Sequence, residues 1–250
     1  MQCDDATARR AIAVLDLTSL NDGDDEAAVR RLCAKAATPE GPVAAICIWP
    51  RFVPLARPLL APGIRLATVA NFPAGADDPA AAAAECAAAI AAGAQEVDVV
   101  VPWRAGPAAV ERLVAACRAA TAGHRLKTIL ETGMLPPAAV EPIARAAVAG
   151  GADMLKTSTG KAAVSATPEA AAVLLAVAAA APRPVGVKVA GGIRTAAQAA
   201  GYLAQADAIL GGGLPGSLGP RQLRIGASGL LDALLAQLGH GPGVKVAGAY

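Results

Sequence analysis

The sequence predicts a single (β/α)8 barrel, a TIM barrel of the α/β class, and three observations favour this fold. Eight short β-like runs alternate with alanine-rich helical stretches along the chain. Most runs follow one another at an interval of about 30 residues, which is the length of one strand-plus-helix unit. The chain has 250 residues, of which 55% are hydrophobic, and this is enough for eight such units around one core.

The predicted strands are short runs of mainly branched apolar residues with few breaks. They lie at residues 11–17, 43–48, 65–70, 96–101, 126–131, 153–157, 185–190 and 223–227. The predicted helices occupy the intervals between them, at roughly residues 24–36, 52–60, 77–92, 107–122, 137–149, 168–181 and 195–206. A further helix is expected after the eighth strand.

Local signals support several of these boundaries. Asp77-Asp78-Pro79 and Thr167-Pro168-Glu169 are typical of helix starts, because an oxygen-bearing cap precedes a proline in the first turn. Gly93 and Gly150-Gly151 are typical of helix ends. No linker or change of composition divides the chain, so we expect one domain over residues 1–250. Its glycine-rich end, at about residues 239–250, is expected to be a flexible tail.

A doubly wound sheet is the main alternative fold. It usually has fewer strands and carries a GxGxxG turn after the first strand. Here the first predicted strand is followed by TSLNDGDD at residues 18–25, which contains no such turn. The barrel is therefore favoured.

Composition excludes several classes of partner. The formal net charge is +2 and only 2% of residues are aromatic, so neither a basic surface nor a stacking platform for nucleic acid is expected. The longest apolar runs, such as residues 170–181, are well short of the roughly 20 residues that a membrane-spanning helix needs. The start of the chain also lacks the pattern of a signal peptide.

The cysteines and histidines indicate a reduced protein without a metal site. The five cysteines are odd in number and none forms a CxxC pair, which is typical of a cytoplasmic protein. The two histidines, His124 and His240, lie in glycine-flanked segments and belong to no HExxH-like cluster. We therefore expect no metal.

Charged residues inside or at the ends of the apolar runs are the candidates for chemistry, because barrel enzymes place catalytic groups at the carboxyl ends of strands and in the loops after them. These residues are Asp16, Asp98, Lys127, Glu131, Lys156 and Lys188. Charges inside a barrel must be paired or retained for function. Lys127 and Glu131 share one side of the fifth run and are expected to pair structurally.

Lys156 and Lys188 lie on neighbouring runs, the sixth and the seventh. If both point inward, like charge and desolvation lower the pKa of an amine, so that one lysine can be neutral and attack a carbonyl to form a Schiff base. Asp98, from the fourth run, would then transfer protons in the same cavity. The alternative is a purely structural network of ion pairs. The co-occurrence of all three charges at strand ends favours catalysis.

Glycine-rich turns supply a candidate phosphate site. Thr159-Gly160-Lys161 is not part of a P-loop, because residue 155 is leucine and residue 162 is alanine. Gly191-Gly192 and Gly226 follow the seventh and eighth runs, where barrels usually bind phosphate at helix N-termini. With Arg194 and Lys161 available, the sequence indicates a phosphorylated carbonyl substrate, a Schiff-base lysine and no cofactor.

Five segments of the chain resemble those of a known enzyme family. LDLTSLN (15–21), EVDVVVPWRA (96–105), GADMLKTSTGKAAVSATPE (151–169), VGVKVAGGIRT (185–195) and RIGASGLL (224–231) resemble the 2-deoxyribose-5-phosphate aldolases. The resemblance covers nearly the whole chain, and the KTSTGK block is highly specific. The longer form of the family, which ends in tyrosine, is the most similar, since this chain ends in Tyr250.

The resemblance implies a class I aldolase. Such an enzyme reversibly cleaves 2-deoxy-D-ribose 5-phosphate into acetaldehyde and D-glyceraldehyde 3-phosphate in deoxyribonucleoside catabolism. It implies small-molecule sugar phosphates and aldehydes as the only substrates, no cofactor and a cytoplasmic location. Dimers are common in the family, so a homodimer stays open, although no interface is evident in the sequence.

The resemblance also implies roles for individual residues. Lys156 would form the Schiff base, Lys188 would lower the pKa of Lys156, and Asp98 would relay protons, with Asp16 supporting the lysines. Tyr250 would assist proton transfer at the methyl-derived carbon of the substrate. The residues expected to bind substrate are Thr18, Cys47, Thr159, Gly160, Lys161, Gly191, Gly192, Ile193, Arg194, Gly226 and Ser228.

Some residues have an alternative explanation, and two depart from the family pattern. Cys47 can equally be a buried structural cysteine, Asp16 can be a loop cap, and Trp49 and Trp103 are expected to pack loops. Gly229 stands where the family often has a second serine, and Val189 where it often has proline. These departures bear on substrate affinity or on the preferred acceptor aldehyde.

Two rival functions fit some of the same features. In a pyridoxal-phosphate protein the lysine would hold the cofactor aldehyde and the glycine loops its phosphate, and the purified protein would be yellow. A sugar-phosphate binder without catalysis could retain the scaffold. The intact set of Lys156, Lys188 and Asp98 argues against that second rival.

Overall fold

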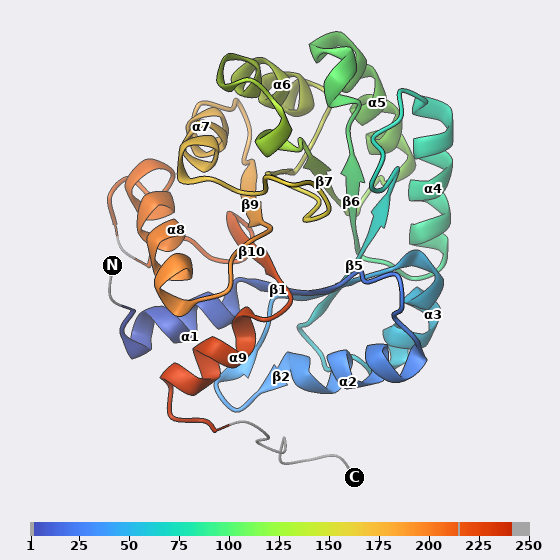
Figure 1. The fold of residues 1–250 in the computed structure, drawn as a ribbon. Helices are drawn as coiled ribbons and strands as arrows, with labels where there is room; N and C mark the ends of the chain where they lie inside the picture. The colour runs from blue at the N-terminus through green and yellow to red at the C-terminus, as the bar shows by residue number, and fades with distance from the viewer. Residues whose placement is uncertain (1–2, 215, 242–250) are drawn as a thin grey trace.

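The computed structural model describes residues 3–214 and 216–241, and its centre is a closed barrel of eight parallel strands (Figure 1). Each strand pairs with the next along the chain, and the last pairs with the first. The barrel strands are β1 (Leu15–Ser19), β4 (Ala45–Ile48), β5 (Arg65–Ala70), β6 (Glu96–Val100), β7 (Arg125–Ile129), β8 (Met154–Lys156), β9 (Gly186–Ala190) and β10 (Leu223–Ala227). The predicted TIM barrel is confirmed.

Helices surround the barrel and alternate with its strands (Figure 1). They are α1 (Asp5–Ala13), α2 (Glu26–Ala36), α3 (Val53–Ala56), α4 (Pro79–Ala91), α5 (Pro107–Ala120), α6 (Pro137–Ala149), α7 (Pro168–Ala179), α8 (Ala196–Ile209) and α9 (Leu230–Gln237). Short 3-10 turns occur at η1 (Pro50–Phe52), η2 (Arg57–Leu59), η3 (Trp103–Ala105) and η4 (Thr132–Met134). A two-stranded antiparallel ribbon, β2 (Ala37–Thr38) and β3 (Gly41–Pro42), lies outside the barrel.

The helix starts follow from local sequence. Asp78 and Thr167 each accept a hydrogen bond from the backbone N–H three residues later, and a proline occupies the first turn. Thr195 and Gln198 form a reciprocal capping box at the start of α8. These caps satisfy N–H groups that have no partner inside the helix. They therefore fix the residue at which each helix begins.

Two sequence predictions about elements were wrong. The run at residues 11–17 was expected to be one strand, but α1 extends to Ala13 and β1 begins at Leu15. Ala8, Ala11 and Ile12 are buried at helical spacing, so an alanine-rich helix merges with the strand without a polar break.

The second error concerns residues 52–60, which were expected to be one helix. The structure has a four-residue α3 between two 3-10 turns instead. Pro54 and Pro58 each lack an N–H donor, and the proline ring clashes with the preceding turn. Pro58 in particular therefore favours a break in the helix at this point.

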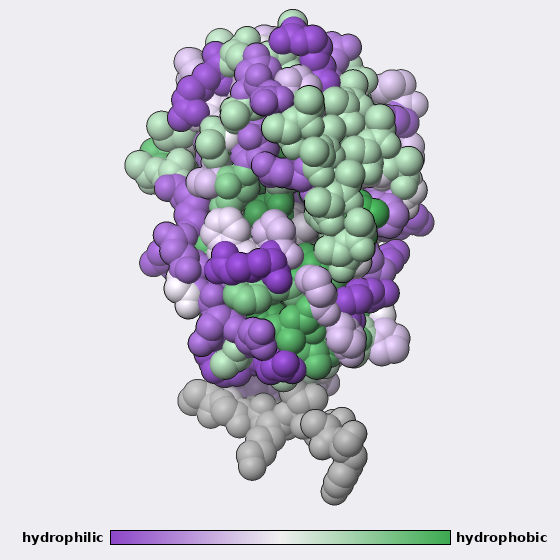
Figure 2. All heavy atoms as spheres, turned by 90° about the vertical axis from the view of Figure 1, so that its right-hand side faces the viewer, coloured by the Kyte–Doolittle hydropathy of each residue, from purple (hydrophilic) through white to green (hydrophobic). Residues whose placement is uncertain are grey.

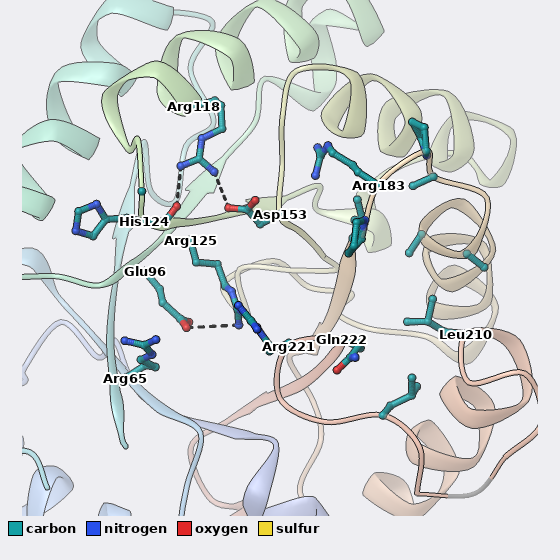
Figure 3. A pocket seen from close by; sticks show the side chains of 18 of the residues that line it. Arg65, Glu96, Arg118, His124, Arg125, Asp153, Arg183, Leu210, Arg221 and Gln222 are labelled. Atoms are coloured by element: carbon teal, nitrogen blue, oxygen red, sulfur yellow. Dashed lines mark hydrogen bonds and ion pairs between the residues drawn. The ribbon is translucent and has the colours of Figure 1, made fainter. Parts of the chain in front are cut away.

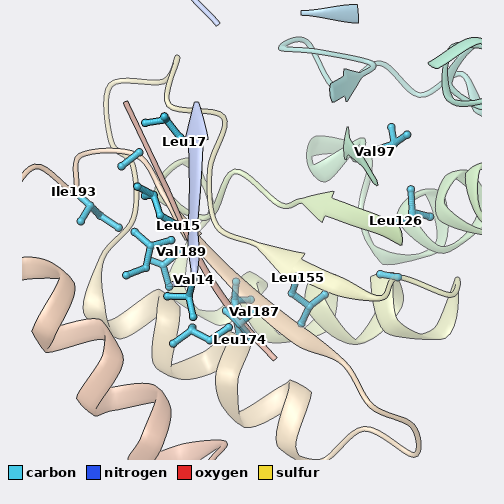
Figure 4. Close-up of a cluster of buried hydrophobic side chains, with 14 of the residues drawn as sticks. Val14, Leu15, Leu17, Val97, Leu126, Leu155, Leu174, Val187, Val189 and Ile193 are labelled. Atoms are coloured by element: carbon cyan, nitrogen blue, oxygen red, sulfur yellow. The ribbon is translucent and has the colours of Figure 1, made fainter. Parts of the chain in front are cut away.

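The apolar core lies between the barrel and its helices (Figure 4). Leu15 and Leu17 of β1 and Val187 and Val189 of β9 belong to it, together with Leu174 of α7. Successive side chains of a strand point to opposite faces. The residues between these apolar positions therefore point into the barrel, and they include Asp16 and Lys188.

The outer surface is mixed in polarity. Figure 2 shows purple hydrophilic and green apolar side chains interspersed on one side of the molecule. The helix α4 contributes exposed alanines such as Ala84 and Ala88. Among the residues that the structure describes, no helix is both long and apolar enough to cross a membrane.

Candidate active site

Lys156, Lys188 and Asp98 meet inside the barrel. Asp98 Oδ2 lies 2.8 Å from Lys156 Nζ and 2.8 Å from Lys188 Nζ. The register places Lys156 directly beside Lys188 on the neighbouring strand. The sequence expectation that these three side chains share one cavity is thus matched by their positions.

Asp16 extends this group from β1. Its Oδ2 lies 2.6 Å from Lys188 Nζ and 3.3 Å from Lys127 Nζ, and its Oδ1 accepts a hydrogen bond from Arg224. The side chain is fully buried. Asp16 is therefore part of the charge network in the barrel and does not cap the loop after β1.

Lys127, in the middle of β7, is also part of the network. Its Nζ lies 2.9 Å from Asp98 Oδ1 and 2.6 Å from Glu96 Oε2. Arg224 Nη2 in turn lies 3.0 Å from Glu96 Oε1. The side chains of all these residues are at most 3% exposed, so the alternating charges replace the branched apolar residues that usually fill a barrel.

The expected pairing of Lys127 with Glu131 was wrong. Lys127 binds Asp16, Glu96 and Asp98 instead. Glu131 lies two residues beyond the end of β7 in a left-handed conformation, with φ at 51°. This turn directs its carboxylate to the loop after β8.

The pKa values of Lys156 and Lys188 shift in opposite directions because the two lysines have different carboxylate partners. Desolvation lowers the pKa of Lys156 below its ordinary value, with Asp98 opposing and Lys188 adding to the decrease. Desolvation acts in the same sense on Lys188, but Asp16 and Asp98 together raise the pKa of Lys188 above the ordinary value. Lys156 is therefore the lysine more easily deprotonated.

The acids of the network are held in the ionised form. Burial opposes ionisation of Asp98, but Lys127, Lys156 and Lys188 together keep the pKa of Asp98 well below its usual range. Arg224 and the lysines likewise lower the pKa of Asp16 against the effect of burial. Three buried cations therefore surround the Asp98 carboxylate, each with its Nζ within 2.9 Å of one of its oxygens.

Thr18 of β1 and Cys47 of β4 are partners in register on neighbouring strands. Cys47 is fully buried in a small apolar cluster with Leu20, Ala67 and Val69. Burial raises the pKa of the Cys47 thiol, and the nearby Asp98 carboxylate adds to this. Thr18 Oγ1 donates to the carbonyl of Asp16 at 2.9 Å. Cys47 is therefore an un-ionised thiol within electrostatic range of the lysines.

The loop after β8 is fixed by Glu131, a contact that sequence reasoning missed. Glu131 accepts hydrogen bonds from Thr159 N at 3.1 Å and from Thr159 Oγ1 at 2.6 Å. Thr159 Oγ1 accepts in turn from Lys161 N at 3.0 Å. An acid directly after a strand was visible in the sequence, but its left-handed backbone was not.

The glycine loops after β8 and β9 lie side by side. A side chain on Gly191 would meet Ser165 at 2.6 Å and the Cα of Gly160 at 3.5 Å. Gly160, Gly191 and Gly192 all have left-handed backbone conformations, which glycine adopts without strain. Close approach of two backbones at the barrel mouth is what an anion cradle requires.

The remaining phosphate candidates differ in position. Arg194 and Ser228 are exposed, whereas Ile193 is buried in the core. Gly226 is buried within β10, where a side chain would meet Lys188 Cε at 2.8 Å and Ala190 Cβ at 2.9 Å. Gly226 thus has a packing reason to be glycine, which the sequence did not reveal.

Lys161 lies at the mouth beside the loop after β1. Its Nζ is 3.3 Å from Asp22 Oδ1 and 5.9 Å from the ring centroid of Trp49. Trp49 also donates from Nε1 to the carbonyl of Asn21 at 2.9 Å and meets Phe72 edge to face. The expectation that Trp49 packs loops is confirmed. Tyr250 and most of the predicted tail lie outside the described residues.

The described part of the chain offers no obvious metal-binding group. Within it, no three His, Cys, Asp or Glu side chains are grouped so that they could hold a metal ion. The buried carboxylates of Asp16, Glu96 and Asp98 are each engaged by lysine or arginine.

Comparison with solved structures gives close similarity over nearly the whole chain. A protein from Toxoplasma gondii ME49, provisionally assigned as a deoxyribose-phosphate aldolase, has a TM-score of 0.85 at 25% identity, covering 96% of this chain and 98% of that chain. A provisionally assigned deoxyribose-phosphate aldolase from Coccidioides immitis has a TM-score of 0.80 at 26% identity, covering 95% and 88%. The tetrameric deoxyribose phosphate aldolase from Aeropyrum pernix has a TM-score of 0.75 at 28% identity, covering 92% and 91%.

The family pattern agrees with these structures and includes the whole barrel. The pattern described as DeoC/LacD family aldolase matches residues 10–235, a span that contains every strand and the barrel lysines Lys127, Lys156 and Lys188. The chain therefore belongs to the DeoC/LacD family of aldolases.

Proposed function

We propose that this aldolase cleaves 2-deoxy-D-ribose 5-phosphate reversibly into acetaldehyde and D-glyceraldehyde 3-phosphate, through a Schiff base on Lys156. The observation that carries the proposal is the difference in ion-pair partners and pKa between Lys156 and Lys188. Lys156 has a single carboxylate partner and a lowered pKa, whereas Lys188 has two carboxylate partners and a raised pKa. A nucleophilic amine must be neutral.

The bond changes in the cleavage direction start at the substrate aldehyde. The neutral Lys156 Nζ attacks the carbonyl carbon, and loss of water leaves a protonated imine. Removal of the proton from the hydroxyl on the third carbon breaks the bond between the second and third carbons. The electron pair of that bond moves to the imine, so the products are D-glyceraldehyde 3-phosphate and an enamine on Lys156.

The second half returns the enzyme to its starting form. The enamine takes up a proton at its terminal carbon, and water then hydrolyses the imine to release acetaldehyde. Asp98 Oδ2 contacts both lysine nitrogens at 2.8 Å, which suits it to carry protons in these steps. We propose Tyr250 as an additional proton carrier, as the family resemblance implies.

The phosphate of the substrate is proposed to bind at the glycine loops. Gly160, Gly191 and Gly192 have left-handed backbones on neighbouring loops, and Gly191 and Gly192 precede the start of α8, where free N–H groups favour an anion. Lys161, Arg194 and Ser228 are exposed around these loops. Substrate spanning from Lys156 to this cradle would have its carbonyl in the barrel and its phosphate at the mouth.

The pathway and the assembly of the protein are part of the proposal. A substrate of this kind arises when deoxyribonucleosides are broken down, so we propose a role in their catabolism. The Aeropyrum pernix relative is a tetramer, and whether this chain forms a dimer or a larger assembly stays a prediction.

Borohydride trapping with acetaldehyde tests the lysine assignment directly. We expect irreversible loss of activity and an N-ethyl adduct on Lys156 by peptide mass spectrometry. The adduct should be absent in Lys156→Ala and unaffected by EDTA. The variant Lys35→Ala, which removes an exposed lysine of α2, is the matched control and should label like the parent. Labelling of Lys188 in place of Lys156, or the absence of any label on Lys156, would overturn the assignment.

A further inference from the structure

A large polar cavity lies at the end of the barrel opposite to Lys156. It has a volume of about 1330 Å³ and is lined by the residues that begin the strands (Figure 3). Arg65, Glu96 and Arg125 are the first residues of β5, β6 and β7, and Gln222 directly precedes β10. Lys156, in contrast, is the last residue of β8. Since all strands are parallel, this cavity and the proposed catalytic site occupy opposite ends of the barrel.

Positive charge dominates the lining. Five arginines face two carboxylates among the lining residues, and Figure 3 shows them converging from several separate segments. The arginines are Arg65, Arg118, Arg125, Arg183 and Arg221, and the carboxylates are Glu96 and Asp153. An open cavity with this imbalance attracts anions.

Two of the arginines have a structural role. Arg118 binds Asp153 at 2.6 Å and donates to the carbonyls of Thr121 and His124. Arg183 Nη2 donates to the carbonyls of Val148 at 2.9 Å and Ala152 at 2.8 Å. Both therefore satisfy carbonyl groups where a helix ends, and neither needs a ligand.

The other three arginines are not explained in this way. Within residues 3–214 and 216–241, the side chains of Arg65 and Arg221 make no hydrogen bond or ion pair. Arg125 donates from Nη1 to the carbonyl of Pro220 at 3.1 Å and lies 3.5 Å from Glu96 Oε1. Glu96 is shared among Arg125, Lys127 and Arg224, so it offsets the charge of Arg125 in part and leaves Arg65 and Arg221 without a carboxylate partner among the described residues.

We propose that this cavity binds a compact anion that carries two phosphate groups. Guanidinium groups bind phosphate through paired N–H donors, and Arg65, Arg125 and Arg221 come from three different strand ends. Three arginines at separate strand starts offer more donors than one phosphate can engage, which favours an anion with more than one charged group. Among the described residues, the lining contains no Phe, Tyr or Trp, so this part of the chain provides no aromatic stacking platform for a nucleotide base.

The site is distinct from the proposed substrate pocket. The glycine loops that are proposed to hold the substrate phosphate follow the carboxyl ends of β8 and β9. The arginine cavity lies at the amino ends of the strands. Its occupation therefore does not depend on whether Lys156 forms a Schiff base.

Isothermal titration calorimetry with inorganic pyrophosphate at low salt tests the proposal. We expect a saturable site in the parent protein that binds pyrophosphate more tightly than inorganic phosphate and that is retained in Arg194→Ala. The double variant Arg65→Ala/Arg221→Ala should bind pyrophosphate at least about tenfold more weakly, because two charge-assisted contacts are lost. Arg125 is left in place, since its change would also disturb Glu96 and the buried network.

The matched control removes the same charge elsewhere. Arg30→Ala/Arg31→Ala changes two exposed arginines of α2 that do not line the cavity, and its affinity should stay within about twofold of the parent. Arg194→Ala should also bind normally. Circular dichroism and thermal unfolding establish that each variant is folded.

Three results would overturn the proposal. One is the absence of saturable binding to the folded parent. Another is an equal loss of affinity in the α2 control, which would indicate attraction by net charge alone. The third is loss of binding in Arg194→Ala with retention in the cavity variant, which would place the anion in the glycine loops.

Discussion

At the scale of single residues, neighbouring lysines in one barrel have opposite electrostatic environments. Lys156 is bound by one oxygen of Asp98, and its side chain is 3% exposed. Lys188 is fully buried between Asp98 and Asp16. The second carboxylate is thus what distinguishes a lysine that stays charged from one that can become a nucleophile.

This difference predicts how the reaction with acetaldehyde depends on pH. The amine of Lys156 reacts only when deprotonated, so the rate should rise with pH through a pKa below that of an ordinary lysine. Lys188→Ala removes a cation that favours deprotonation and leaves Asp98 to act on Lys156. We expect the midpoint of the pH profile to move upward and turnover near neutral pH to fall at least about tenfold. Pre-steady-state trapping with borohydride at a series of pH values measures this.

The control for that profile is again Lys35→Ala, which removes a lysine with an exposed ion pair. Its profile should match the parent. A Lys188→Ala profile that does the same would contradict the assigned role of Lys188.

At the scale of elements, β10 packs against β9 through a position that has no side chain. Gly226 is partnered with Ala190 in the sheet, and a Cβ at this position would meet Lys188 Cε and Ala190 Cβ. We expect Gly226→Ala to displace Lys188, to destabilise the fold by about 1–3 kcal/mol and to lower turnover. Chemical denaturation and steady-state kinetics check both effects. Gly201→Ala, in α8 with open space around it, should be neutral or stabilising by about 0.5–1 kcal/mol.

The loop between β8 and α7 offers a second test at this scale. Glu131 holds Thr159 through two hydrogen bonds, so it acts as a positioning residue for the proposed phosphate cradle. Glu131→Ala should raise KM for the phosphorylated substrate several-fold more than KM for unphosphorylated deoxyribose. The exposed Glu141→Ala serves as the control. An equal effect on both substrates would show that Glu131 only stabilises the barrel.

The bounds of helices and strands were predicted best where glycine, proline or polar residues separate one element from the next. Strand β5 and helix α6 have the predicted bounds, because glycine, proline and aspartate mark the intervals around them. The start of β1 was misplaced since no such residue separates it from α1. Alanine-rich helices and apolar strands differ little in composition, so only a break distinguishes them.

The candidate site was predictable to the extent that it depends on strand ends. Lys156, Lys188 and Asp98 converge because their side chains point into the barrel, Lys156 from the end of β8 and the other two from the middle of their strands. The partners of Lys127 could not be predicted, because the barrel register sets which inward side chains meet, and the register is not visible in one sequence. The role of Glu131 depends on a left-handed residue, which few non-glycine positions adopt.

At the scale of the whole molecule, the barrel interior is a continuous set of buried charges. Asp16 contacts Lys188 and Lys127 and accepts from Arg224. We expect Asp16→Asn to destabilise the protein by about 3–5 kcal/mol, because it leaves buried cations without their counter-ion. The exposed partner of Lys35, changed in Asp232→Asn, should cost no more than about 1 kcal/mol.

The same charges predict how stability responds to acid. The pKa values of Asp16 and Asp98 are lower in the folded protein than in the unfolded chain. Their contribution to the free energy of unfolding is therefore fully present above the pKa of an unfolded aspartate, near 4. It is lost progressively as the pH falls from there toward the lower pKa values of the folded protein. Urea unfolding between about pH 5 and pH 3 should show a steep loss of stability in the parent, and a shallower one in Asp16→Asn.

The contact between Lys161 and Trp49 makes the barrel mouth observable by fluorescence. The chain has two tryptophans, Trp49 and Trp103, and Trp103 is stacked under its own neighbour Arg104 at 3.7 Å. Trp49 instead has an ammonium group from the loop after β8 near its ring, and a bound sugar phosphate would draw that cation away. In Trp103→Phe, the emission of a single indole would then report occupancy of the mouth in real time, without a coupled assay or a label.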